Sequence, residues 1–97
     1  MSDLANSKFV GTWKPATIVF FGKKDNFESN SRIDLRADGT ALMYSPDEKE
    51  EDKKAFIWKE TDYGLFLDGK NDLKLKYIDD TLYLKFLGVK IGYIKEK

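Results

Sequence analysis

The sequence has no cysteine and no histidine among its 97 residues. Without cysteine the chain forms no disulfide and offers no thiolate to a metal ion. Without histidine it lacks the commonest general base and the commonest zinc ligand, so Ser-His and Cys-His nucleophilic catalysis is excluded. We therefore expect a protein that is not an enzyme and that holds neither a metal ion nor a cofactor.

Long apolar runs and an excess of charge are also missing. No stretch approaches the ~20 apolar residues that a membrane-spanning helix needs. Residues 1–6 show no basic segment followed by an apolar run. We therefore expect no signal peptide, which fits a cytoplasmic protein or the mature part of an exported bacterial one. The 17 basic and 17 acidic residues balance, which points away from nucleic acid as a partner.

The residues that are present are enough for one all-β domain. Hydrophobic residues make up 41% of the chain and aromatic residues 14%. Residues 1–97 therefore supply one core and leave no room for a second. No helix-length segment shows a 3.6-residue apolar period. We expect one short helical turn over residues 4–9, followed by strands and turns, and a monomeric protein.

The first strand is predicted over residues 10–21, which are rich in Thr, Ile, Val and Phe. Pro15 removes a backbone donor and predicts a bend or bulge. Residues 22–31 predict a loop because of their Gly, Asn and Ser content. Asp38-Gly39 predicts a two-residue type I′ turn, with three pairs of cross-strand partners: Ala37 and Thr40, Leu35 and Leu42, and Ile33 and Tyr44.

The middle of the chain is less regular. Residues 46–53 predict an acidic loop, which lacks the sharp glycine turn of an EF-hand calcium loop. Residues 54–61 and 65–68 predict two strands joined by a turn, with Gly64 in a left-handed conformation. Apolar residues occupy both faces of this hairpin, so the sequence leaves its inward face open.

The last three strands have the clearest register. Turns at Asp79-Asp80 and Leu87-Gly88 place nine apolar residues on one face: Leu73, Leu75, Tyr77, Leu82, Leu84, Phe86, Val89, Ile91 and Tyr93. The opposite face carries Lys74, Lys76, Lys85 and Lys90. A slip of one residue would expose the whole apolar set, so the two turns independently support one register.

The hairpins add up to about eight strands in meander order. An open sheet of this size would leave two unpaired edges and an uncovered apolar face. We therefore predict that the sheet closes into an antiparallel up-and-down barrel. Trp13, near the start of the first strand, is expected to fill the floor of this barrel as a buried core residue.

The opening of the chain resembles a known group of barrels. Gly11-Thr12-Trp13, at the start of the first strand, is similar to the opening of lipocalins and fatty-acid-binding proteins, the calycin group. The resemblance implies a small bacterial lipocalin-like barrel in which a late basic residue, Lys95 or Lys97, lies against the tryptophan. The chain departs from fatty-acid-binding proteins because it lacks their helix pair and late arginine.

Candidate site residues lie near the predicted mouth. Inward apolar residues would line a small apolar pocket or fill the barrel, since eight strands enclose room for side chains or for one small ligand; they are Phe20, Phe21, Ile33, Tyr44, Leu73, Phe86 and Val89. Phe27 stands alone in a polar loop, where it would cover the mouth or contact a partner.

Two functions of different classes follow. The first is a binding module that takes a small apolar ligand at the open end of the barrel. The second is a protein-interaction domain that acts through residues 22–31 and 46–53. The chain resembles staphostatins, which are bacterial cysteine-protease inhibitors, in size and plan. An internal cavity of a few hundred Å³ would favour the ligand, and a filled interior would favour the protein partner.

Overall fold

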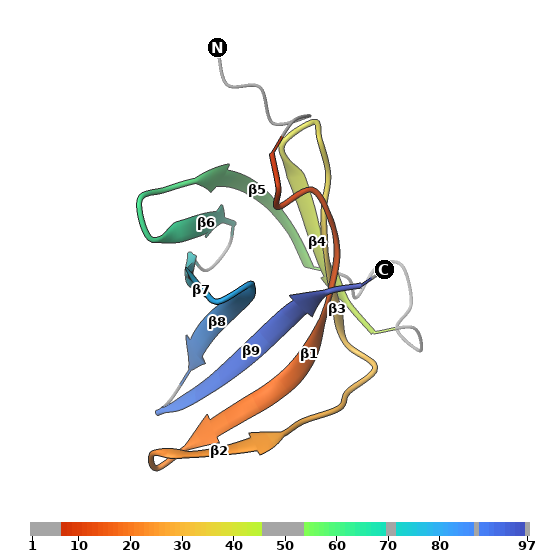
Figure 1. The fold of residues 1–97 in the computed structure, drawn as a ribbon. Helices are drawn as coiled ribbons and strands as arrows, with labels where there is room; N and C mark the ends of the chain where they lie inside the picture. The colour runs from red at the N-terminus through yellow and green to blue at the C-terminus, as the bar shows by residue number, and fades with distance from the viewer. Residues whose placement is uncertain (1–6, 46–53, 70–71, 87, 97) are drawn as a thin grey trace.

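The protein is an all-β barrel (Figure 1). The structure is a computed structural model that describes residues 7–45, 54–69, 72–86 and 88–96. These residues form nine strands: β1 (Gly11–Phe20), β2 (Lys23–Asn26), β3 (Arg32–Leu35), β4 (Thr40–Tyr44), β5 (Lys54–Glu60), β6 (Gly64–Asp68), β7 (Leu73–Ile78), β8 (Thr81–Phe86) and β9 (Val89–Lys95).

The predicted closure of the barrel is confirmed. Strand β9 pairs antiparallel with both β8 and β1, so the first and last strands of the meander meet. The pairing of β1 with β9 shifts register between Pro15 and Thr17, where Pro15 predicts a bulge. Strands β2 and β3 both pair with β1, β3 near its start and β2 near its end. The wall is therefore an eight-stranded meander barrel with β2 as an extra strand.

The N-terminal part differs from expectation in two places. Residues 23–26 form strand β2 inside the segment predicted as a loop, because Phe21 and Gly22 adopt φ values of 51° and 78° and turn the chain back onto β1. No helix forms among the described residues, and the turn after Ser7 is a single backbone bond in which Val10 donates to the Ser7 carbonyl. Residues 4–6 of the expected helical turn lie outside the described residues.

The predicted register of the β3–β4 hairpin is wrong by one residue. Ile33 faces Met43 rather than Tyr44, and Leu35 faces Ala41. The Asp38 carboxylate accepts hydrogen bonds from the backbone N–H and the hydroxyl of Thr40, at 2.9 and 2.6 Å. Together with Gly39 at φ 92°, these bonds favour a three-residue turn with a glycine bulge over the two-residue turn.

The last three strands have the predicted register. Tyr77 faces Leu82, Leu84 faces Ile91 and Phe86 faces Val89. The turn between β7 and β8 places Asp79 and Asp80 at φ 51° and 63°, the positive values that a type I′ turn requires. The four lysines on the opposite face are all exposed, as the alternation predicted.

The structure shows which face of the β5–β6 hairpin points into the barrel, a question that the sequence left open. Phe56 and Trp58 are buried inside, while Ile57 is 65% exposed on the outside. Gly64 begins β6 at φ 154° and lies against β7, where an added Cβ would overlap the Leu75 carbonyl oxygen and come within 2.8 Å of the Tyr77 nitrogen. Only glycine fits this close approach of two backbones.

The core fills one end of the barrel. Its largest fully buried side chains are Trp58, Ile33, Leu35, Leu65, Leu67, Leu75 and Leu82. Trp13 is 2% exposed, as expected for the floor residue, and its indole N–H donates to the Phe9 carbonyl at 2.9 Å. The Tyr77 ring packs edge-on against Phe9 at 5.0 Å. We call the end that holds Trp13 and these rings the closed end.

Lys95 partly matches the expected basic residue beside the tryptophan. It pairs with Trp13 in register, its stem lies over Gly11, where an added Cβ would be 2.6 Å from Lys95 Cε, and its ammonium donates to the Lys8 carbonyl at 2.9 Å. Lys97 lies outside the described residues. The glycine of the opening motif therefore leaves room for the lysine stem that crosses the floor.

No helix that could cross a bilayer occurs in the described part of the chain. The same residues hold no group of three acidic, histidine or cysteine side chains that could bind a metal ion.

Candidate interaction surfaces

The residues predicted to line a pocket separate into two groups. Phe20 on β1, Val89 on β9 and Phe86 on β8 are cross-strand neighbours at the end of the barrel opposite Trp13, which we call the open end. Leu73 on β7 is half-buried and packs against the core cluster.

The other three predicted residues lie elsewhere. Ile33 is 1% exposed beside Trp13 in the core. Tyr44 falls on the opposite face of its hairpin from Ile33 because of the register shift. Phe21 is 85% exposed at the hairpin turn. The structure therefore does not bring the seven residues into one pocket wall.

The hollows that described residues line lie mainly outside the barrel. A notch of about 140 Å³ at the open end has Met43, Tyr44, Lys54 and Tyr93 among its lining residues. Larger clefts of about 620 and 550 Å³ lie on the outer wall. The buried side chains pack together around Trp13 and Trp58 as one cluster.

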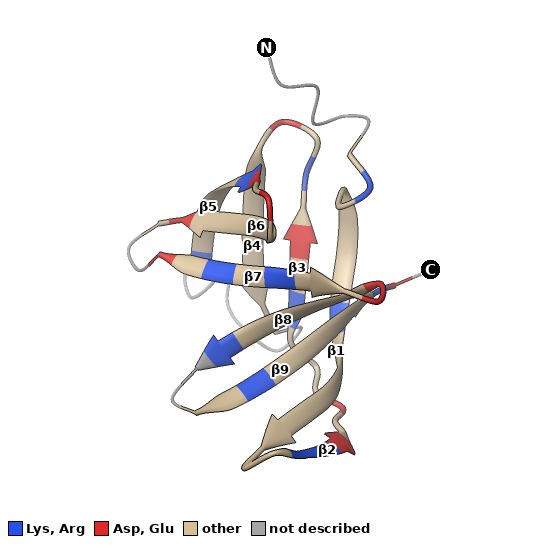
Figure 2. Cartoon of the chain, turned by 60° about the vertical axis from the view of Figure 1, so that its left-hand side comes forward, with Lys and Arg blue, Asp and Glu red and all other residues tan. Residues whose placement is uncertain are grey.

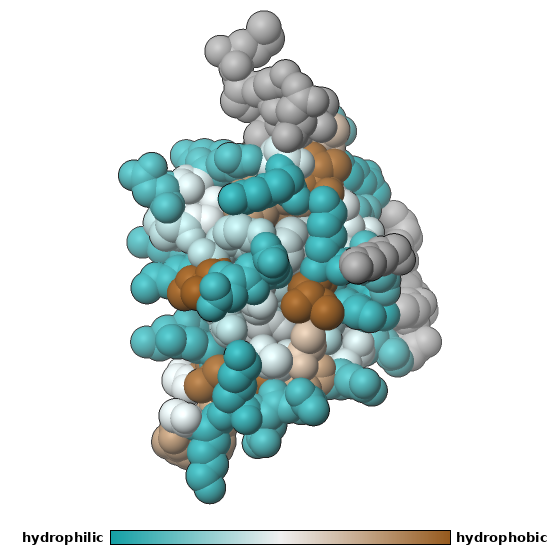
Figure 3. Space-filling view, in the orientation of Figure 1, coloured by the Kyte–Doolittle hydropathy of each residue, from teal (hydrophilic) through white to brown (hydrophobic). Residues whose placement is uncertain are grey.

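The tip of the β1–β2 hairpin carries the most exposed large apolar side chain among the described residues. The Phe21 ring packs edge-on against the Phe20 ring with centroids 4.2 Å apart, and Phe20 is itself 50% exposed. Figure 3 shows apolar atoms at the lower end of the molecule, where β1 turns into β2. Phe21 has a φ of 51°. Glycine and asparagine adopt such positive values readily, but bulky residues rarely do. The turn therefore holds an aromatic ring in water at a cost in backbone energy.

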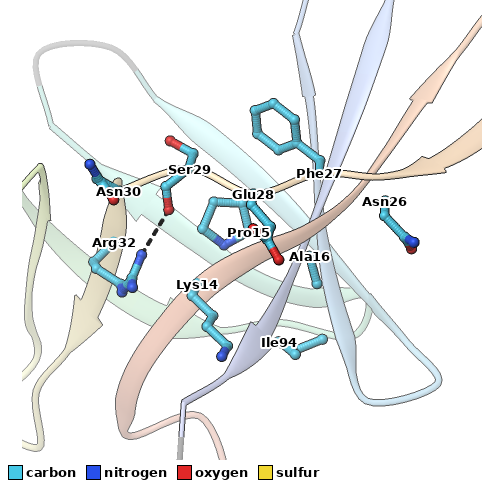
Figure 4. A pocket seen from close by; sticks show the side chains of 10 residues that line it. All are labelled: Lys14, Pro15, Ala16, Asn26, Phe27, Glu28, Ser29, Asn30, Arg32 and Ile94. Atoms are coloured by element: carbon cyan, nitrogen blue, oxygen red, sulfur yellow. Dashed lines mark hydrogen bonds between the residues drawn. The ribbon is translucent and has the colours of Figure 1, made fainter.

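A cleft of about 620 Å³ lies beside this hairpin, where the chain crosses from β2 to β3 (Figure 4). It forms at the bulge of β1, where the Phe27 N–H donates to the Ala16 carbonyl at 3.0 Å. Arg32 holds the crossing segment by donating to the Ser29 carbonyl at 3.0 Å. The half-buried Phe27 ring points to the opposite side of the segment from Glu28.

Three groups in the described part of the chain have shifted pKa values, and none of them forms a catalytic pair. Hydrogen bonds from Thr40 lower the pKa of Asp38. The hydrogen bond that the Tyr77 hydroxyl donates to Asp80 at 2.9 Å raises the pKa of Tyr77. Burial raises the pKa of Tyr93, which is 4% exposed. Each shift has a local structural cause, so none of them points to a reaction centre.

Comparison with known proteins supports the fold. No protein-family model matches the sequence, and no curated protein does. The fold is similar to that of an uncharacterized protein from Bacteroides eggerthii, with a TM-score of 0.61 and 13% sequence identity over 92% of this chain and 100% of the other. Because the identity is low, the likeness concerns only the small antiparallel barrel.

The exposed hairpin tip and its extra strand were missed at the level of sequence. Lys23, Lys24, Asp25 and Asn26 have little strand preference, so the segment resembled a loop. The available signal was Gly22, which follows an apolar strand at the second position of a two-residue turn.

Proposed function

We propose that this chain is a non-enzymatic protein-binding module and that the β1–β2 hairpin meets the partner. The observation that carries the proposal is the strained, 85% exposed Phe21, whose ring packs edge-on against Phe20. Aromatic residues are enriched at the centres of protein interfaces. A substitution that removed the strain at this exposed position would not harm folding. The presence of a strained phenylalanine here is therefore best explained by a contact with another molecule.

The hairpin also offers backbone groups to a partner. Strand β2 pairs only with β1 among the described residues, and all four of its residues are exposed. A partner segment in extended conformation would add a strand at this free edge and receive the aromatic tip at one end. The 620 Å³ cleft next to the hairpin would take a side chain of the same partner.

The experiment is a quantitative pull-down from an extract of the source cells with three immobilised chains. These are the wild type, Phe21→Asn, and Ile57→Asn as the matched control, since Ile57 is 65% exposed on the outer wall. We expect a protein retained by the wild type and by Ile57→Asn but lost with Phe21→Asn. The same set of proteins on all three chains would contradict the proposal.

A small apolar ligand at the open end is the second candidate. The observation that favours it is the row of cross-strand neighbours Phe20, Val89 and Phe86 at the open end. Native mass spectrometry of protein purified under mild conditions would show a stoichiometric bound lipid if this candidate is correct. A mass equal to that of the chain alone would count against it.

The barrel is best described as lipocalin-like, and we include that description in the proposal. It is supported by Gly11 and Trp13 at the start of β1 and by Lys95 crossing the floor beside them. A protease inhibitor of staphostatin-like plan would be one form of a protein-binding module. Loss of papain-like protease activity in the presence of the chain would support that form.

A further inference from the structure

A second surface lies on the outer wall of the barrel, away from the hairpin tip. We call it the lysine face and define it as Lys59, Lys74, Lys76, Lys85 and Lys90, on strands β5, β7, β8 and β9. All five side chains are exposed. Both ion pairs formed within the described part of the chain involve arginine, so these five lysines have no carboxylate partner there. Figure 2 shows the basic positions of β7, β8 and β9 facing the viewer together.

The strand register brings these lysines side by side. Phe66 lies between Lys59 and Lys74, with one on each neighbouring strand. Lys85 directly faces Lys90, and like charges at such positions destabilise a sheet. The chain has as many acidic residues as basic ones, yet it places none between these two lysines. Binding of an external anion therefore explains the arrangement of these lysines better than a contribution to folding stability does.

The lysines surround a real depression. A cleft of about 550 Å³ is lined by four lysines, with Asp72 as the only carboxylate among its lining residues. The lysines are Lys74, Lys76, Lys85 and Lys90, and the apolar and aromatic lining residues are Phe66, Leu73, Tyr83 and Leu84. The Tyr83 ring lies close to Gly92, where an added Cβ would be 3.1 Å from Tyr83 Cε1. Cations rim the cleft and a partly apolar floor lies below them.

We propose that the lysine face binds an extended acidic segment of a partner protein. The aromatic rings argue for a peptide over single-stranded nucleic acid, which needs open stacking surfaces. The Lys59 ammonium lies over the Phe66 ring, 5.5 Å from its centroid, so one face of that ring is already covered. Both arginines, the usual residues of planar phosphate recognition, lie outside the cleft at Arg32 and Arg36.

The spacing of the strands sets the size of the segment. Adjacent strands lie about 4.8 Å apart, so the part of the lysine face on β7 to β9, which carries the lysines of the cleft, extends about 10 Å across the strands. An extended peptide advances about 3.3 Å per residue, so about three residues cover this part of the face. The inference is independent of the proposed docking of the hairpin, because the residues of the two surfaces do not overlap.

The experiment measures binding of a fluorescent peptide of alternating Asp and Ser to the full chain by anisotropy at low and physiological salt. A peptide with Asn in place of Asp and a single-stranded oligonucleotide of equal charge are measured in parallel. The test variant is Lys85→Gln with Lys90→Gln. The control variant is Lys8→Gln with Lys54→Gln, which removes the same charge from exposed lysines that lie outside the cleft and outside strand β2.

We expect binding of the Asp peptide that weakens with salt and no binding of the Asn peptide. The test variant should bind about three- to tenfold more weakly, because individual exposed ion pairs are weak, and the control variant should bind like the wild type. Phe21→Asn should also bind the peptide like the wild type. Equal losses in the test and control variants, no binding of the Asp peptide, or tighter binding of the oligonucleotide would overturn the proposal.

Discussion

The two ends of the barrel differ in the exposure of their aromatic side chains. At the closed end, Trp13 is 2% exposed and Phe9 3%, and their rings pack with Tyr77. At the hairpin tip near the open end, Phe21 is 85% exposed on a strained backbone. Aromatic side chains thus stabilise the fold at one end and are kept in water at the other. Exposure and backbone strain, rather than residue type, distinguish Phe21 from the aromatic residues of the core.

The largest effect should come from the closed end. Trp13→Ala removes a buried indole and leaves a cavity, so the free energy of unfolding should fall by about 3–5 kcal/mol. Chemical denaturation followed by circular dichroism measures this change. A variant with near-native stability would show that the closed end does not depend on its indole.

The hairpin tip should respond with the opposite sign. Phe21→Asn replaces an exposed ring by a residue that tolerates positive φ, so the free energy of unfolding should rise by about 1 kcal/mol. The same denaturation experiment gives the value. If stability falls instead, the Phe20–Phe21 stack contributes to folding, and the contrast between the two ends is weaker than we describe.

A smaller gain is expected on the lysine face. Lys85→Gln removes the repulsion from Lys90 across the strand pair, so stability should rise by about 0.2–1 kcal/mol at low salt. The gain should shrink in high salt, because exposed charges are screened. An equal gain at both salt concentrations would mean that packing, not charge, changed.

The smallest effect concerns the pH dependence of Tyr93. Tyr93 is 4% exposed, and burial raises the pKa of its hydroxyl above the ordinary value of 10.0. A raised pKa in the folded state means that stability is kept below pH 10 and lost as the pH rises through the folded pKa. Wild type should lose stability more steeply than Tyr93→Phe between neutral and alkaline pH. Parallel denaturation curves at each pH would contradict this.

The sequence predicts the regular parts of this fold and misses the parts that local bonds decide. Leu75, Leu84 and Ile91 each lie next to a lysine in the sequence, so only one register buries all three and leaves the lysines outside. The β3–β4 hairpin differs from the predicted register by one residue because the Asp38 carboxylate accepts hydrogen bonds from Thr40. The alternation of apolar and polar residues does not reveal such local hydrogen bonds. Strand β2 has no apolar face of its own and forms because Gly22 turns it onto β1.

The candidate site is less predictable for a related reason. Phe20 and Val89 are predicted together and lie together, because both follow the alternation of long strands. Phe21 is predicted inward but sits at a turn, where alternation ends and the side chain points into water. The lysine face is visible as a stripe in the sequence, but the cleft over Phe66 and Tyr83 depends on how strands β6 to β9 curve around the barrel.

Native-state hydrogen exchange, followed amide by amide with NMR, tests the contrast between the two ends most directly. The account predicts that amides of β1 and β9 that face each other exchange as slowly as those of the buried strands β6 and β7. It also predicts that the outward amides of β2 exchange many times faster through local opening. Fast exchange along the β1–β9 seam, or slow exchange throughout β2, would show that the barrel is not closed there or that its hairpin edge is not free.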